Sequence, residues 1–273
     1  MTPEISVVTV CFNASSTIAD TLSSVANQSD VEFEHIVVDG GSSDSTLDLI
    51  RRHAHNRLFA VSEPDDGIYD AMNKGLARAN GRYVMFLNAD DYLARPDALA
   101  IAAAKLVETN ADCLLADTQF VGRDGRTPQY RRYSTRPFGR WWLRFGAQPP
   151  HPSMLMRRKL IHELGGFDTQ FRIAGDFDLI ARAFLLHRAA YAKLPVVMTH
   201  FRLGGISTGG LKSKVVLSRE LAFSLKRMGY RLSALRVMFR LPFKLLQLQL
   251  PFPRRRYSSE WFSAGKDSSS ERC

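Results

Sequence analysis

The sequence predicts an α/β fold with a mostly parallel sheet flanked by helices. Short apolar runs alternate with amphipathic segments through residues 5–91, and several of these runs end in polar, glycine-containing loops. Strands that alternate with helices in this way form parallel sheets with helices on both faces. With 273 residues and 45% hydrophobic residues, the chain can form one large domain, or one domain with an appendage.

The first half contains the clearest elements. A β-branched run at residues 5–11 predicts a buried strand, and Asn80-Gly81 predicts the end of a helix. We expect strands at residues 5–11, 33–38, 58–62 and 83–87, and helices at residues 17–27, 47–55 and 69–79.

The second half is less regular. We expect strands and loops at residues 114–121, 123–133 and 141–146, helices at residues 160–164 and 176–186, and a strand within residues 191–201. A flexible Gly-containing loop should follow at residues 204–210 and could act as a lid. Residues 257–273 are Ser-rich and polar, which predicts a disordered tail.

The positive charge is concentrated near the carboxyl end. Residues 211–256 contain twelve Lys or Arg residues and one acid, Glu220, whereas the whole chain has a net charge of +10. We therefore divide the chain into a main α/β domain at 1–210 and a basic amphipathic helical appendage at 211–256. Arg236, Arg240 and Lys244 recur at helical spacing beside apolar residues, a pattern typical of a helix that lies on an anionic membrane surface. Packing against the domain and dimer formation are the alternatives; no motif accompanies the charge that would predict nucleic-acid binding.

Cysteine use and hydropathy limit the class of protein. Cys11, Cys113 and Cys273 have no metal-ligand spacing, and three unpaired cysteines favour a reducing compartment. No signal peptide or membrane-spanning apolar stretch is expected, so we predict a cytoplasmic protein that is peripheral on the inner face of the plasma membrane.

Acidic residues follow three successive predicted strands. Asp39, the pair Asp65-Asp66 and the pair Asp90-Asp91 each come at such an end. In a parallel sheet these ends share one edge, where ligands bind, so the acids should converge on one crevice. Adjacent carboxylates repel unless a cation or a set of donors holds them, which favours a divalent cation, Mn²⁺ or Mg²⁺. Acids in turns or helix caps are the simpler alternative.

Other nucleotide-binding motifs are missing. The sequence contains no GxxxxGK[ST], and no GxGxxG follows the first strand, which excludes P-loop and dinucleotide-binding domains of the usual kind.

Four blocks of sequence resemble family 2 glycosyltransferases of the GT-A fold, most of all bacterial enzymes of exopolysaccharide and lipopolysaccharide biosynthesis. The blocks are residues 6–13, 37–44, 62–75 and 86–91. The resemblance is close over residues 4–95 and looser over residues 147–210.

The resemblance implies a site for a nucleotide-sugar donor and favours UDP as its nucleotide. It places Thr9, Phe12, Asn13, Asp39, Asp65, Lys74, Asn88 and Asp90 at the donor nucleotide. Asp39 would contact the base, and Asp65 would lie near the base and ribose. Residues 88–91 correspond to the DXD-type motif, with Asp91 on the metal and Asp90 on the ribose or metal. Asn88 replaces the first Asp of that motif, and Lys74 could equally be a solvated helix residue.

The second half should supply the acceptor side. Residues 165–168 and 173–179 resemble the family segment that contains the catalytic base, which places Asp176 at that position and Asp178 as runner-up. Gly175 stands where many members have Glu. A carboxylate there would take the proton of the acceptor hydroxyl; the alternative is an N-cap. His151 is expected near the acceptor or as a structural residue, and His200 as a possible metal ligand.

Together these features predict an inverting, metal-dependent glycosyltransferase that uses a nucleotide-sugar donor and a lipid-linked or glycan acceptor in bacterial surface polysaccharide biosynthesis. A polyprenyl-phosphate glycosyl synthase is the alternative enzyme. A non-catalytic nucleotide-binding module that docks on membranes is the alternative of another class.

Overall fold

The computed structural model describes residues 3–204 and 210–230. The predicted tail at 257–273 and most of the predicted appendage, from residue 231 onward, lie outside the described residues.

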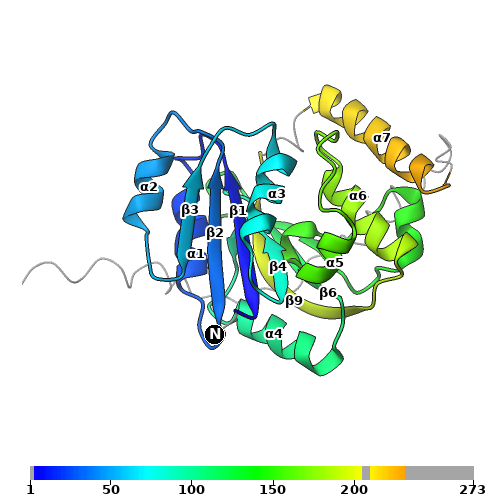
Figure 1. The fold of residues 1–273 in the computed structure, drawn as a ribbon, viewed down its shortest axis with the longest axis horizontal. Helices are drawn as coiled ribbons and strands as arrows, with labels where there is room; N and C mark the ends of the chain where they lie inside the picture. Colours follow the sequence, from blue (N-terminus) through cyan, green and yellow to red (C-terminus); the bar gives the residue numbers. More distant parts are fainter. Residues whose placement is uncertain (1–2, 205–209, 231–273) are drawn as a thin grey trace, which may run out of the picture.

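The described chain alternates between strands and helices (Figure 1). The strands are β1 (Ile5–Cys11), β2 (Phe33–Asp39), β3 (Leu58–Ser62), β4 (Tyr83–Phe86), β5 (Tyr92–Leu93), β6 (Cys113–Val121), β7 (Pro128–Tyr133), β8 (Met154–Arg157) and β9 (Tyr191–Arg202). The α-helices are α1 (Ile18–Ala26), α2 (Thr46–Arg52), α3 (Ile68–Arg78), α4 (Ala98–Thr109), α5 (Arg158–Glu163), α6 (Gly175–Ala181) and α7 (Gly210–Arg227). Two 3₁₀-helices, η1 (Arg140–Phe145) and η2 (His151–Ser153), and one π-helical turn, η3 (Arg182–Leu186), complete the list.

The strands form one sheet in the order β3-β2-β1-β4-β8-β6-β9-β5, and β7 pairs with β6. The first four strands are parallel, and their register aligns Cys11 with Asp39 and Asp39 with Ser62. Antiparallel pairing begins where β8 meets β4, although β6 and β9 are parallel to each other. The predicted α/β class is therefore confirmed, and its parallel part is the half that carries the acidic loops.

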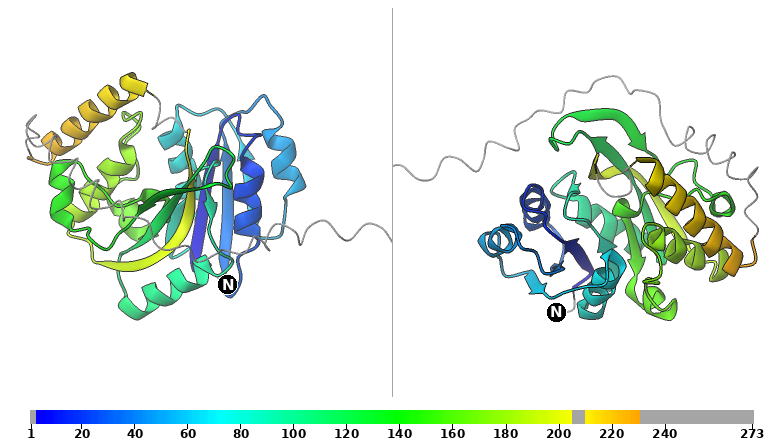
Figure 2. Two further views of the ribbon diagram at one scale, coloured as in Figure 1. Left: turned by 180° about the vertical axis from the view of Figure 1, so that it is seen from behind. Right: turned by 90° about the horizontal axis from the view of Figure 1, so that it is seen from above.

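Alternating side chains of the strands build a separate core on each face of the sheet. Val8, Val10, Ile36 and Val38 pack with residues of α3, α5, α6 and α7. Ile5 and Val7 face the other way and pack with residues of α1 and α4. Figure 2 shows from two further directions how the helices cover the sheet.

Several elements differ from the expectation. Residues 140–145 form the 3₁₀-helix η1 and no strand, and the helix expected at 176–186 is α6 followed by the π-helical turn η3. No helix or strand was expected where α4 and β8 lie. The five alanines of α4 nevertheless favour a helix. β8 is four residues long and needs β4 and β6 on its two sides, so its pairing arises only in the folded sheet.

Helix α7 packs against the domain, although it begins the segment that we expected to be an appendage. Leu221 and Leu225 are 2% and 0% exposed and belong to the same core as α6. In Figure 1, α7 lies beside α6 at the top right of the molecule. The first part of the basic segment is thus built into the fold. Within the described residues, no helix is long and apolar enough to cross a membrane.

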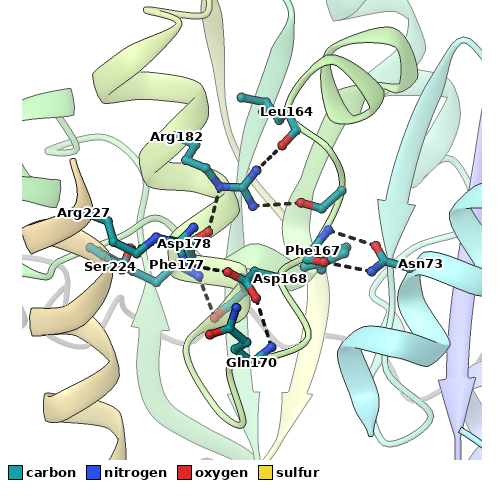
Figure 3. Close-up of polar contacts among 12 residues, drawn as sticks. Asn73, Leu164, Phe167, Asp168, Gln170, Phe177, Asp178, Arg182, Ser224 and Arg227 are labelled. Carbon is teal, nitrogen blue, oxygen red and sulfur yellow. Dashed lines mark hydrogen bonds and ion pairs between the residues drawn. The ribbon is translucent and has the colours of Figure 1, made fainter. Parts of the chain in front are cut away.

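A buried ion pair joins α6, η3 and α7 (Figure 3). Asp178 is completely buried; its carboxylate binds Nε of Arg182 at 2.7 Å and accepts a hydrogen bond from the Ser224 hydroxyl at 2.8 Å. The Arg182 guanidinium also donates to the carbonyl oxygens of Leu164 and Gly166. Asp178 therefore connects three elements of the second half.

We expect Asp178→Ala to lower the free energy of unfolding by about 3 kcal/mol, because it leaves the buried Arg182 without its carboxylate partner. Urea unfolding of the purified protein would measure this. Asp176→Asn is the matched control, because Asp176 lies two residues away and makes no bond to Arg182 in the described structure. Equal stability of Asp178→Ala and the unmodified protein would contradict the structural role of Asp178.

Candidate functional site

The loops after β1 and β2 are tied together at the carboxyl edge of the parallel strands. Asn13 has a left-handed backbone, with φ of 48°, and its Oδ1 accepts the Ser43 amide at 2.9 Å. Its own amide donates to the Ser42 hydroxyl at 2.8 Å. Asn tolerates this backbone conformation, so the residue fixes both loops at once. It was expected at the donor nucleotide, and the structure places it at this edge.

Asp39 organises the loop that follows β2. The side chain is fully buried, and its carboxylate accepts hydrogen bonds from the amides of Gly41 and Ser42 and from the hydroxyls of Ser42 and Ser62. Burial raises the pKa of Asp39, but these donors outweigh burial and hold the pKa below its usual range. The contacts seen are thus to the protein's own loop, and contact with a nucleotide base stays a prediction.

Phe12, Gly40 and Asp65 lie together beside this loop. A Cβ on Gly40 would collide with the Asp65 carboxylate and would contact the Phe12 ring, so a larger residue here would push the Asp65 side chain aside. Asp65 also accepts the Gly67 amide at 2.8 Å. Phe12 is 64% exposed, which is unusual for a large apolar residue at the end of a buried strand. An exposed aromatic ring beside a partly exposed carboxylate can bind a planar, hydrogen-bonding group.

Asp90 and Asp91 follow β4 and differ in environment. Asp91 is completely buried; its Oδ1 accepts the Arg202 amide at 3.2 Å, and its Oδ2 has no partner among the described residues. Burial first, and the neighbouring charge of Asp90 second, raise the pKa of Asp91 well above its usual value. Burial also raises the pKa of Asp90, against the opposing charges of Arg202 and His151.

His200 lies on β9 opposite Tyr92, the residue that follows Asp91. Its ring is 4.9 Å from the Tyr92 ring, and its Nδ1 is buried with no partner in the described part of the chain. Burial lowers the pKa of His200 to about 4, so the imidazole is neutral at neutral pH, the form that binds metals.

These side chains fit a hard divalent cation in part. A positive charge would stabilise the two adjacent carboxylates, whose pKa values are raised. It would also interact favourably with the unpartnered oxygens of Asp91 and Asn88. No group of three or more acidic, His or Cys ligands is assembled in the described residues. Mg²⁺ and similar ions are commonly held by one or two carboxylates together with substrate phosphates, so this set fits a cation that binds with its substrate.

Asp176 lies in the first turn of α6, and two residues from the stretch before β8, Gln148 and His151, hold its carboxylate. Its Oδ2 accepts a hydrogen bond from Nε2 of Gln148 at 2.7 Å and lies 3.2 Å from Nδ1 of His151. Burial raises the pKa of Asp176, but the hydrogen bonds and charge of His151, then Gln148, outweigh it, so the pKa is lowered overall. The carboxylate is therefore ionised at neutral pH and can accept a proton.

His151 connects the two halves of the site. It contacts Asp176 directly, and the 3₁₀-helix η2 on which it lies leads into β8, whose first residues pair with the carboxyl end of β4, the strand that precedes Asp90. Its Nε2 is buried and has no partner within the described residues. The structure thus brings the predicted acceptor-side residues, Asp176 and His151, close to the predicted metal motif.

Three predicted residues lie elsewhere or are occupied. Thr9 does not reach the sheet edge: it is fully buried in the middle of β1, and its hydroxyl pairs with Nε2 of buried His35 at 3.0 Å. Lys74 binds Asp70 at 2.9 Å and the Pro64 carbonyl at 2.7 Å. Asp178, the alternative base, is enclosed by Arg182 and Ser224, so Asp176 is the acid that remains available.

Sequence reasoning missed residues that shape the site. Gln148 binds Asp176, and Arg202 binds Asp91 through its amide and the Asp90 carbonyl through Nε at 3.2 Å. Tyr69 donates its hydroxyl to the Ile173 carbonyl at 2.7 Å. Their partners are distant in sequence, so periodicity and local motifs carried no signal for them.

Comparison with known proteins gives a consistent assignment. Residues 6–166 match the family Glycosyl transferase family 2. A PGL/p-HBAD biosynthesis glycosyltransferase of Mycobacterium bovis is 31% identical over 209 residues, which are 75% of this chain and 79% of that protein. The putative teichuronic acid biosynthesis glycosyltransferase TuaG of Bacillus subtilis is 42% identical over 92 residues, 33% of this chain and 36% of that protein.

Solved structures share the fold. TarS 1–349 of S. aureus, in complex with UDP-GlcNAc, superimposes with a TM-score of 0.65 and 23% identity over 89% of this chain and 72% of that chain. The mannosyltransferase PcManGT of Pyrobaculum calidifontis, in complex with GDP-Man and Mn²⁺, gives a TM-score of 0.57 and 20% identity over 90% of this chain and 81% of that chain. The predicted GT-A fold is thereby confirmed. The chain belongs to glycosyl transferase family 2, and it is a glycosyltransferase whose relatives include enzymes of cell-surface polysaccharide and glycolipid biosynthesis.

Proposed function

We propose that this enzyme is an inverting, metal-dependent glycosyltransferase that transfers a sugar from a UDP-sugar to a lipid-linked glycan in bacterial surface polysaccharide biosynthesis. The observation that carries the proposal is the position of His151, which binds Asp176 and lies just before β8, at the carboxyl end of β4 that leads to Asp90 and Asp91. An acceptor-side carboxylate and a donor-side acidic pair thus belong to one site.

The donor side is the edge formed by the loops after β1, β2 and β4. The exposed Phe12 ring and the Asp65 carboxylate suit the base and ribose of a nucleotide. UDP is favoured because the TarS structure was solved with UDP-GlcNAc. Asp90 and Asp91, with Asn88 just before them and His200 brought opposite Tyr92 by the pairing of β5 with β9, would hold Mn²⁺ or Mg²⁺ together with the diphosphate. The cation supplies positive charge against the charge of the departing diphosphate.

On the acceptor side, Asp176 takes the proton of the attacking hydroxyl. The acceptor oxygen then forms a bond to the anomeric carbon as the bond from that carbon to the diphosphate oxygen breaks, and the nucleoside diphosphate leaves with the electron pair. Attack from the side opposite the leaving group inverts the anomeric centre. Gln148 and His151 hold the carboxylate in the orientation that accepts the proton.

The proposed acceptor and location are supported by the names of the relatives and by the charge of the basic segment. The relatives named above belong to PGL/p-HBAD and teichuronic acid biosynthesis, which favours a glycolipid or glycan acceptor. The outer face of α7 exposes Val215, Arg219, Phe223 and Lys226, an apolar and cationic surface suited to an anionic bilayer. We place the enzyme in the cytoplasm, on the inner face of the plasma membrane.

The first prediction concerns the reaction. A screen of nucleotide sugars should find Mn²⁺-dependent turnover with a UDP-sugar, and Asp176→Asn should lower transfer by about 10²–10⁴-fold, because the acceptor hydroxyl loses its proton acceptor. Donor hydrolysis and transfer would both be measured. Transfer that survives in Asp176→Asn would favour a polyprenyl-phosphate acceptor, which needs no deprotonation. Absence of turnover with every donor would refute the proposal.

The second prediction concerns the metal. Asp91→Asn should abolish the Mn²⁺-dependent part of UDP binding, because it removes a carboxylate with a buried, unpartnered oxygen. Isothermal titration calorimetry with and without EDTA would measure it. Asp48→Asn on exposed α2 is the control, and unchanged Mn²⁺-dependent binding in Asp91→Asn would exclude this residue as a ligand.

The third prediction concerns the membrane. A chain that ends after Tyr230 should lose sedimentation with anionic vesicles, because the basic residues from Arg231 to Arg256 contribute about 1 kcal/mol each near such a surface. Neutral vesicles are the control for charge. Cutting after residue 210 would be unsuitable, since it removes the buried Leu221 and Leu225. Undiminished sedimentation of the shortened chain would contradict docking through residues 231–256.

A further inference from the structure

The carboxylate of Glu220 binds three consecutive backbone amides. Its oxygens accept the amides of Arg172, Ile173 and Ala174 at 2.8, 2.9 and 2.8 Å. Hydrogen bonds from amides to a carboxylate are charge-assisted and stronger than those between neutral groups. Glu220 is the one acid of the basic segment, residues 211–256, and its carboxylate is engaged within the domain.

The segment that Glu220 binds leads directly into α6. Asp176 is two residues beyond Ala174, so the path of this segment sets the position of the Asp176 side chain. The Tyr69 hydroxyl fixes the same segment by donating to the Ile173 carbonyl at 2.7 Å. Gly175 lies against the Tyr69 ring, where any Cβ would collide with the ring carbons. The segment is thus held by α7 through its amides and by α3 through a carbonyl.

Glu220 is part of one polar face of α7. Ser224 and Arg227 follow it at helical spacing; Ser224 binds Asp178 at 2.8 Å, and the Arg227 guanidinium binds Asp168. Figure 3 shows how Ser224 and Arg227 project from α7 toward Asp178 and Asp168. All three contacts reach the stretch of chain on either side of Asp176, but only Glu220 binds the residues immediately before it.

We propose that Glu220 is a positioning residue for Asp176: by fixing the amides of residues 172–174 it holds the base where Gln148 and His151 bind it. This inference rests on the proposed role of Asp176 and adds a residue from α7 to the machinery of transfer. Glu220 itself touches no substrate. A displacement of the base by about 1 Å costs on the order of 10²-fold in rate, which sets the size of the expected effect.

The test compares Glu220→Ala and the milder Glu220→Gln with the unmodified full-length enzyme. We expect kcat for transfer to fall by about 10–100-fold in Glu220→Ala and less in Glu220→Gln, while the KM for the donor and the affinity for UDP stay unchanged. Ser224→Ala is the matched control on the same face of α7. It removes a bond to Asp178, so it should lower stability without a comparable loss of kcat.

A double variant separates positioning from general damage. In the Asp176→Asn background, Glu220→Ala should cause no further loss of the residual transfer, because its effect passes through the carboxylate that is already absent. An additive loss, a loss of UDP affinity equal to the loss of kcat, or an unchanged kcat in Glu220→Ala would each overturn the proposal.

Hydrogen exchange makes the outcome independent of the proposed reaction. The amides of residues 172–174 should lose protection in Glu220→Ala but keep it in Ser224→Ala. If the unmodified enzyme transfers no sugar from any donor, the proposed function fails, and the exchange result alone decides whether Glu220 holds this segment. Unchanged protection in Glu220→Ala overturns the positioning role in either case.

Discussion

The parallel pairing of β1 with β2 and β4 is the constraint on which the site depends. Because these strands run in register, the loops that follow Cys11, Asp39 and Phe86 emerge at one edge of the sheet. Polar groups that are 29 or more residues apart can then meet, as Asn13 does with Ser42 and Ser43. The two apolar cores fix this register, since a shift by one residue would exchange the faces of every strand.

The second half closes the same edge through antiparallel strands. β9 passes beside β5 and brings Arg202 to the acidic pair, where it binds the Asp91 carboxylate and the Asp90 carbonyl and also forms an ion pair with Asp20 on α1. Two adjacent carboxylates with raised pKa values, Asp91 fully buried and Asp90 partly buried, are thereby tolerated in the folded protein. Burial of such groups costs stability unless charge or donors offset it, so this cost marks the place where a cation has most to contribute.

Patterns that are local in sequence predicted the parallel half well. Asp39 is the last residue of β2, Asp65 lies in the loop after β3, and Asp90-Asp91 lie in the loop after β4, as the alternation of strands and helices indicated. The contact of Thr9 with His35 in the interior could not be predicted, because a motif match does not register which face of β1 a residue occupies. The resemblance named Asp176 and His151 as candidates, but their contact joins residues of η2 and α6 and could not be predicted from spacing. The packing of α7 on the domain could not be predicted from the sequence either, because a cationic amphipathic helix has the same sequence pattern whether it packs on a protein or on a bilayer.

The bond pattern of Glu220 has an evolutionary consequence. Its partners are backbone amides, which every residue except proline supplies, so the side chains at residues 172–174 are free to change without disturbing the attachment. Among related chains, the glutamate of α7 should therefore persist while the residues it binds diverge, and proline should be rare at those three positions. The chain beside Asp176 could in this way diverge in sequence while Asp176 itself stays in place.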